Sequence, residues 1–166
     1  MPRNEQGLTC DRYTCIPRTL IFLTRRDSVL LLKGAPTKRI WANKYNGVGG
    51  HVERGEDILA SAKRELLEET GLSADLRLVG TLLVDVEPDT GICLYIFTGE
   101  CLNGESRPSG EGALEWLLFA ELERYPLVED VEILLKRIRK MSTSDAPFSA
   151  RSFYDGDEKL QVRFGE

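Results

Sequence analysis

Short apolar runs separated by polar turns make up most of the chain, and they predict strands. Runs at 18–24 and 29–33 flank the polar residues 25–28, which indicates a hairpin. A second pair of runs, at 76–86 and 92–100, flanks a turn that contains Pro88 and Gly91. Further strands are expected at 45–52, 114–118, 152–155 and 159–164, with loops at 34–44, 101–112 and 142–147.

Two longer segments, 57–70 and 127–140, have the period of an amphipathic helix instead. The first contains no proline or glycine, and Gly71 follows it in the position of a left-handed C-terminal cap. Its apolar stripe consists of Ile58, Leu59, Ala62 and Leu66. The apolar positions of the second are Val128, Val131, Leu134, Leu135 and Ile138, and basic residues occupy its last turns.

Strands mixed with two long helices predict an α/β fold, an α/β/α sandwich with a central mixed sheet. The length is that of one domain and the chain shows no repeats, so we expect residues 1–166 to form a single domain. Residues 1–16 are mainly polar and are expected to form a flexible arm in front of that domain.

The first predicted helix carries three glutamates on one face. Glu65, Glu68 and Glu69 are spaced i, i+3, i+4, so their carboxylates project together, beside the edge of the apolar stripe. Like charges at this spacing repel, and partial burial raises the cost. A hard divalent cation relieves both problems, and Mg²⁺ characteristically binds a few carboxylates together with substrate phosphates. The alternative is an ordinary solvated helix face.

The residues around this face favour the metal site over a solvated surface. Gly49 and Gly50 precede the helix, and glycine lets a backbone approach a ligand closely. The carbonyl of Gly49 is therefore a candidate metal ligand. Arg64 lies next to Glu65 and can hold either that carboxylate or Glu56 in place.

Composition excludes several classes of protein. A net charge of −5 argues against a nucleic-acid polymer as partner, because phosphate recognition by charge needs a basic face. No apolar run is long enough to span a membrane, and the N-terminus lacks a signal-peptide core. The four cysteines have no metal-binding spacing, so free thiols in a cytoplasmic protein are expected. The cysteines are Cys10, Cys15, Cys93 and Cys101.

The stretch GHVERGEDILASAKRELLEETGL, residues 50–72, resembles the full signature of the Nudix hydrolases. Gly50, Glu56 and Gly71 occupy positions that are structural in that motif, and Arg64 and the three glutamates occupy the catalytic ones. The resemblance implies an α/β/α sandwich, Mg²⁺ (or Mn²⁺ as a substitute) and a small nucleotide substrate. The box alone covers 23 residues, but the likeness extends beyond it.

Outside the box, the chain resembles the MutT-like branch, and within it the oxidised-purine nucleoside triphosphatases. The KWNGFGGK-type approach of that group is similar to residues 44–50, which places Asn46 at the base. An acidic residue five positions before a strand Trp serves the metal there, and Glu111 has this spacing to Trp116. A pair of acids reads the purine edge, and Glu129 and Asp130 occupy the matching place.

Each of these assignments has an alternative in the sequence. Glu111 can be a simple loop carboxylate, and Glu129 and Asp130 can be acids that the dipole favours at the start of a helix. The chain also departs from the group's Trp-Pro-Asp-Asp sequence, with Leu127 in place of the aromatic residue. This departure bears on base identity more than on reaction type.

Three basic residues and one histidine complete the candidates. Lys38, Arg39 and Lys44 in the loop at 34–44 either meet phosphates at the mouth of the site or serve solubility. His51 has no obvious partner and is expected to be a surface strand residue.

The expected reaction is Mg²⁺-dependent hydrolysis of a nucleoside triphosphate to the monophosphate and pyrophosphate, with Glu65, positioned by Arg64, taking the proton of the attacking water. A rival is an enzyme that cleaves ADP-ribose or another nucleoside-diphosphate sugar, since Pro88 lies where a proline is associated with that subfamily. Turn chemistry explains Pro88 equally well. A non-catalytic Nudix-fold binding module is disfavoured because all box glutamates are present. Monomer and homodimer both remain open.

Overall fold

The computed structural model describes residue 7 and residues 12–107 and 110–165. One eight-stranded mixed sheet runs through the molecule, in the order β3-β2-β1-β5-β4-β7-β8, with β6 also paired to β2. The strands are β1 (Thr14–Arg25), β2 (Ser28–Gly34), β3 (Tyr45–Asn46), β4 (Arg77–Glu87), β5 (Thr90–Glu100), β6 (Gly112–Leu118), β7 (Phe148–Tyr154) and β8 (Leu160–Phe164). The helices are α1 (Ile58–Thr70), the 3₁₀ helix η2 (Phe119–Arg124) and α2 (Val131–Ile138).

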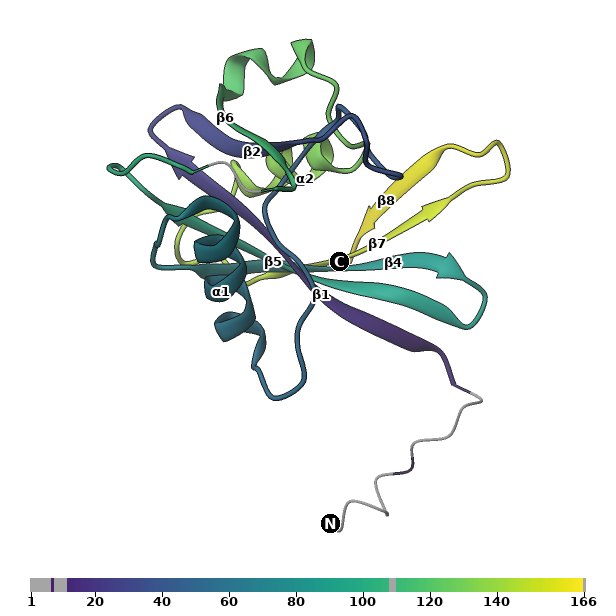
Figure 1. Ribbon diagram of the computed structural model, residues 1–166. Helices are drawn as coiled ribbons and strands as arrows, with labels where there is room; N and C mark the ends of the chain where they lie inside the picture. Colours follow the sequence, from purple (N-terminus) through teal and green to yellow (C-terminus); the bar gives the residue numbers. More distant parts are fainter. Residues whose placement is uncertain (1–6, 8–11, 108–109, 166) are drawn as a thin grey trace.

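The predicted sandwich is confirmed, because α1 and α2 cover opposite sides of the sheet (Figure 1). Alternate residues of β1 point to the two sides, as the two-residue period of a strand requires. Leu20 and Phe22 belong to the apolar cluster that includes α2, whereas Ile21 and Leu23 belong to the cluster that includes α1. The two hairpins expected from the apolar runs, β1–β2 and β4–β5, are both antiparallel pairs.

Several element boundaries differ from the sequence expectation, and one element was not expected. β1 begins at Thr14, so the last residues of the expected arm belong to a strand that pairs with β5; residues 1–6 and 8–11 of the arm lie outside the described residues. Only residues 45–46 of the expected strand at 45–52 pair continuously, and the rest makes isolated bridges to β1. β7 begins four residues early, and η2 was not predicted.

The second helix is shorter than its apolar period suggested. It spans 131–138 rather than 127–140, because the backbone just before it pairs with β3. The amide of Tyr45 donates to Pro126 at 2.9 Å, and the amide of Val128 donates to Tyr45 at 2.9 Å. This pairing draws residues 126–128 toward the sheet and fixes where the acids before α2 lie.

The first helix agrees with its predicted ends but not with all of its predicted buried face. Asp57 caps its N-terminus, accepting from two backbone amides at 2.9 Å, and Gly71 has the left-handed conformation at φ 70°. Ala62 and Leu66 are buried as expected, but Leu59 is 37% exposed. Ser61 is buried instead, and its hydroxyl donates to the carbonyl of His51.

Candidate active site

Gly49 and Gly50 bring the chain against both β1 and α1. A Cβ atom on Gly49, which has φ 147°, would lie 2.2 Å from the carbonyl oxygen of Thr19. A Cβ atom on Gly50 would lie 2.5 Å from a carboxylate oxygen of Glu65. Only glycine fits both approaches, so the two glycines allow Glu65 to lie directly against this backbone.

Arg64 joins the acids of the box. Its Nε and Nη2 donate to the two oxygens of Glu56 at 2.7 and 3.0 Å, and its Nη1 donates to Glu65 at 2.8 Å and to Glu68 at 3.1 Å. Nη2 also donates to the carbonyl of His51 at 3.1 Å. These bonds hold the pKa of Glu56 near 2, well below its usual range, and raise the pKa of Arg64. One guanidinium therefore fixes the positions of three carboxylates.

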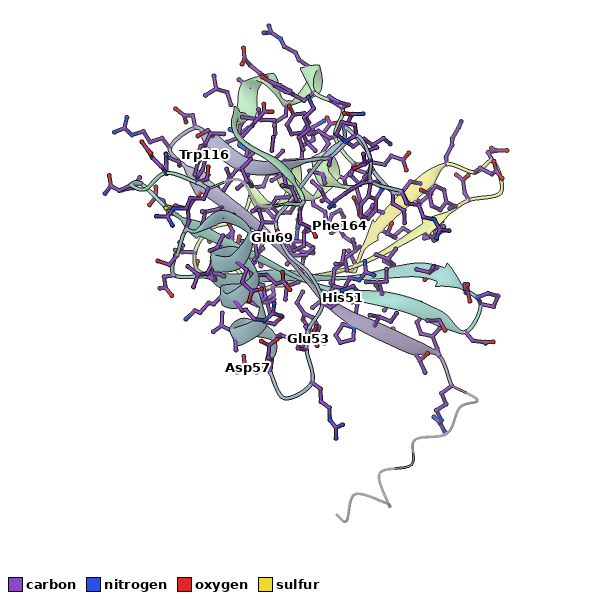
Figure 2. All side chains as sticks on the ribbon, in the orientation of Figure 1. His51, Glu53, Asp57, Glu69, Trp116 and Phe164 are labelled. Carbon is purple, nitrogen blue, oxygen red and sulfur yellow. The ribbon has the colours of Figure 1, made fainter. Side chains whose placement is uncertain are left out.

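Glu69 is the third glutamate on the predicted acidic face of α1, and its surroundings differ from those of Glu65 and Glu68. It lies near the C-terminal end of α1 (Figure 2), and its carboxylate accepts from the amide of Gly49 at 3.2 Å. Burial raises its pKa to about 7, an effect that the Gly49 hydrogen bond opposes and that the charges of Glu65 and Glu111 reinforce. Because the charges of Glu65 and Glu111 both act on Glu69, the structure brings these three carboxylates close enough to interact electrostatically.

Glu111 approaches the other acids from just before β6, and it is paired with a lysine. Lys38 donates to its carboxylate at 2.5 Å, and the amide of Ala35 donates to its backbone carbonyl at 3.3 Å. The ion pair of Lys38 with Glu111 therefore attaches the loop at 34–44 to the acids of the site. The sequence proposed Lys38 for substrate phosphates and gave no signal for this ion pair.

The donor set fits a hard divalent cation. Glu65, Glu68, Glu69 and Glu111 offer carboxylate oxygens, Gly49 can add its carbonyl, and magnesium prefers oxygen ligands of this kind. Within the described residues, no group of three or more acidic, histidine or cysteine side chains is gathered closely enough to hold a metal ion. Lys38 is paired with Glu111, and Arg64 is paired with Glu65 and Glu68. We attribute the wide separation of the four carboxylates to these ion pairs.

The residues proposed for the base lie around the joint between β3 and α2. Lys44 approaches Glu129 at 3.8 Å, and the hydroxyl of Tyr154 donates to Glu129 at 3.0 Å. Burial raises the pKa of Asp130, with a smaller contribution from Glu129. Asn46 accepts from the amide of Gly47 at 2.8 Å through Oδ1, which orients its amide nitrogen as a donor for a ligand.

Two residues of this region were missed by the sequence reading, and one candidate is not brought in. Tyr154 is the last residue of β7, and nothing in the sequence marked it as a partner of Glu129. Thr19 accepts from the amide of Gly50 at 3.4 Å, a contact that no motif indicates. The structure gives Arg39 no hydrogen bond or ion pair with the described residues. His51 has an exposed side chain, as expected, and contributes only its carbonyl.

Three other features bear on the expectations. Cys15, Cys93 and Cys101 are free thiols, and Cys10 lies outside the described residues. No helix in the described part of the chain is long and apolar enough to cross a membrane. Two surface hollows, around Arg139 and around Lys136, contain none of the candidate site residues, so the acids do not lie in either.

A mixed sheet lies between two helices, and the helix that carries the glutamates packs against Gly49 and Gly50. These features define a Nudix-type domain. The family model described as NUDIX domain matches residues 16–138, and the chain belongs to the Nudix hydrolase family. It is an enzyme family that acts on small nucleotide substrates and typically depends on a divalent metal.

Two relatives carry the name oxidized purine nucleoside triphosphate hydrolase. The zebrafish (Danio rerio) protein is 36% identical over 100 residues, which are 59% of this chain and 63% of that protein. The mouse (Mus musculus) protein is 34% identical over 113 residues, 67% of this chain and 69% of that protein. The chain therefore matches slightly less than two thirds of the zebrafish protein's length.

Solved structures agree on the fold. A MutT protein from Bacillus halodurans has a TM-score of 0.74 at 26% identity, covering 90% of this chain and 97% of that one. The NUDIX domain of Shewanella oneidensis NrtR, complexed with ADP ribose, has a TM-score of 0.70 at 14% identity, covering 84% and 98%. The first likeness extends to sequence, and the protein is MutT-like; the second concerns the fold alone.

Proposed function

We propose that the protein is a Mg²⁺-dependent nucleoside triphosphate pyrophosphohydrolase that acts on oxidised purine nucleotides such as 8-oxo-dGTP. The observation that carries the proposal is the Arg64 network, in which one guanidinium binds Glu65 and Glu68, with Glu65 against Gly50 and Glu69 bonded to the amide of Gly49. The names of the zebrafish and mouse relatives support the choice of substrate.

The metal would be held by Glu65, Glu68, Glu69 and Glu111 with the carbonyl of Gly49. Bound there, Mg²⁺ supplies charge neutralisation on the phosphoryl oxygens and orientation of a water in line with the leaving group. Lys38 is paired with Glu111, one of the acids assigned to the metal, so we assign Lys38 to the phosphates. Lys44 and Arg39 lie on the same loop.

The proton of the attacking water needs an acceptor, and we assign this role to Glu65. Its carboxylate accepts from Nη1 of Arg64 at 2.8 Å, which fixes its orientation. Arg64 acts in this scheme as a positioning residue that does not contact the substrate.

The base is assigned to Asn46, Glu129 and Asp130. An amide nitrogen donates, and a carboxyl group accepts or, when protonated, donates. The raised pKa of Asp130 increases the fraction that can donate. Leu127 offers no aromatic face, so we expect looser base selectivity than an aromatic residue at this position would give.

ADP-ribose is the main competing substrate, but no feature of the structure favours it. Pro88 lies in the two-residue turn between β4 and β5, and its fixed φ suits such a turn. The proline therefore has a structural explanation that does not involve substrate. ADP-ribose serves as the comparison in the assays below.

Pyrophosphate release from 8-oxo-dGTP with Mg²⁺ tests the proposal. Glu68→Gln and Glu69→Gln should each lower turnover by about 100-fold or more, because each removes a charged oxygen ligand. The fold should persist, as measured by circular dichroism. Glu53→Gln, an exposed acid in the same box, is the matched control and should keep full activity. Near wild-type turnover of either box variant at saturating Mg²⁺ would show that the metal assignment is wrong.

A further inference from the structure

One of the two surface hollows is bordered by three arginines and, among the described residues, by no acid. It has a volume of about 240 Å³. Arg26, Arg77 and Arg139 line it, and its other walls are threonine and apolar side chains, among them Phe22 and Phe119. In a protein with a net charge of −5, three positive charges at one hollow indicate a place for an anion.

The fold brings the three arginines together from separate elements. Arg77 of β4 pairs with Thr98 of β5, and Thr98 pairs with Phe22 of β1. Directly paired residues point to the same side of a sheet, and here it is the side on which α2 packs. Arg139 is the residue at which α2 ends, and Arg26 lies in the turn between β1 and β2. The hollow therefore exists only in the folded protein.

Within the described part of the chain, none of the three guanidinium groups forms an ion pair or a hydrogen bond. Arg139 lies over the ring of Phe119 at 4.7 Å, a contact that leaves its N–H donors available. Both carboxylate oxygens of Asp145 accept from Ser142, at 2.8 and 2.9 Å. These bonds are the main reason for the lowered pKa of Asp145, to which the charge of Arg77 contributes least. The donors of the hollow are therefore available to a ligand.

Local structure explains only one of the three arginines. A basic residue is favoured at the C-terminal end of a helix, which suits Arg139. Glu132, an acid of the adjacent hollow, is paired with Lys136 rather than with Arg139. Arg26 has φ 51°, a left-handed conformation that favours glycine and is uncommon for other residues. Such conformations occur disproportionately at functional sites, so an arginine in this turn needs a reason beyond the turn.

We propose that this hollow binds the phosphate group of a small phosphate ester, with Arg26, Arg77 and Arg139 as donors. A guanidinium has only donors and matches the oxygens of phosphate in pairs. A phosphate dianion offsets more of the three positive charges than one carboxylate does. The volume is smaller than that of pockets for drug-sized ligands, and the apolar walls favour an ester over the free ion.

The hollow is separate from both parts of the proposed active site. The glutamates of α1 lie on the opposite side of the sheet (Figure 1). Glu129 and Asp130, assigned to the base, precede α2, whereas Arg139 ends it, and the eight residues of the helix span about 12 Å. A phosphate bound here therefore belongs to a second ligand, and the inference does not depend on the proposed function.

Calorimetry in EDTA at constant ionic strength tests the site, because without a divalent cation the acids of α1 repel phosphate. We expect the wild-type protein to bind phenyl phosphate, and Arg77→Met and Arg139→Met each to weaken binding by about tenfold or more. Arg54→Met, in an exposed loop, and Arg163→Met, which also stacks on a phenylalanine ring, are matched controls and should bind as the wild type does. Glu69→Gln should bind it as well.

Three results would overturn the proposal. They are no binding by the wild-type protein, an equal loss in the two control variants, and a loss in Glu69→Gln, which would place the phosphate at the acids of α1. Inorganic phosphate and pyrophosphate, titrated in the same way, identify the source of the phosphate group. Tighter binding of phenyl phosphate than of either ion supports an ester, and equal affinities would overturn the role given to the apolar walls.

Arg26→Gly separates a binding role from a structural one. Glycine adopts φ 51° without strain, so the midpoint of urea unfolding in chloride should stay the same or rise. Phenyl phosphate should raise the midpoint of the wild-type protein, because a ligand stabilises the state that binds it, and should raise that of Arg26→Gly much less. A lower midpoint in chloride with an unchanged response to phenyl phosphate would show that Arg26 serves the turn alone and would overturn its assignment.

Discussion

Arg64 and Glu69 show how two neighbouring parts of one helix face acquire different chemistry. Arg64 donates to Glu56, Glu65 and Glu68, and its hydrogen bonds lower the pKa of Glu56. Glu69 lies on the buried side, where desolvation raises its pKa to about 7. The sequence predicted that the acids share a face and that Arg64 holds Glu65 or Glu56. It did not predict which acid would be buried, because that depends on how Gly49 packs against β1.

The pKa of Glu69 makes stability depend on pH in a definite direction. In the unfolded chain the carboxyl has an ordinary pKa of about 4.3, so between this value and about 7 the folded state binds more protons. The free energy of unfolding should therefore fall as pH rises through this window when no divalent cation is present. Urea unfolding in EDTA at several pH values measures this, and Glu69→Gln should flatten the profile. Parallel profiles for the two proteins would contradict the pKa assignment.

Replacing Arg64 tests its positioning role. Lysine keeps the charge but not the planar fork that contacts three carboxylates at once. Arg64→Lys should lower kcat by about 10–100-fold and change KM little, as for outer-shell groups that orient ligands. Arg54→Lys, in the exposed loop before α1, is the control and should leave both constants unchanged. A raised KM with an unchanged kcat would point instead to direct contact with phosphate.

At the scale of elements, the site depends on the approach of residues 48–51 to α1 and β1. The absence of proline and glycine from 57–70 and the cap residue Gly71 predicted the ends of α1 well, because such signals act locally. The length of α2 was overestimated, because the pairing of residues 126–128 with Tyr45 is a long-range contact that periodicity does not register. The extent of β1 was underestimated for a similar reason, since its first residues are held by β5.

Gly50→Ala tests the approach of loop and helix. The added Cβ would lie 2.5 Å from a carboxylate oxygen of Glu65, so that side chain must move. We expect a loss of about 100-fold in kcat, as for comparable displacements of catalytic groups, with the fold preserved. Gly156→Ala, where a Cβ meets nothing within 4 Å, is the control and should be fully active. Wild-type kcat in Gly50→Ala would show that the position of Glu65 is not critical.

In the whole molecule, the sheet separates two faces of different character. On one face, α1 presents the glutamates, and on the other, α2 packs against the apolar cluster of β1, β4, β5 and β7. The box motif predicted the glutamates by residue number. The resemblance supplied Asn46, Glu129 and Asp130 for the base, and these remain predictions.

Product analysis after incubation with Mg²⁺ and a panel of 8-oxo-dGTP, dGTP, dATP, dCTP and ADP-ribose tests the central claim most directly. We predict a nucleoside monophosphate and pyrophosphate as products, with purines preferred and 8-oxo-dGTP among the better substrates. Asn46→Ala and Asp130→Ala should flatten the ranking of bases by about 1–3 kcal/mol per lost contact while pyrophosphate release persists. Equal rates on purine and pyrimidine triphosphates would contradict the base assignment. Faster cleavage of ADP-ribose than of any triphosphate would contradict the proposed function itself.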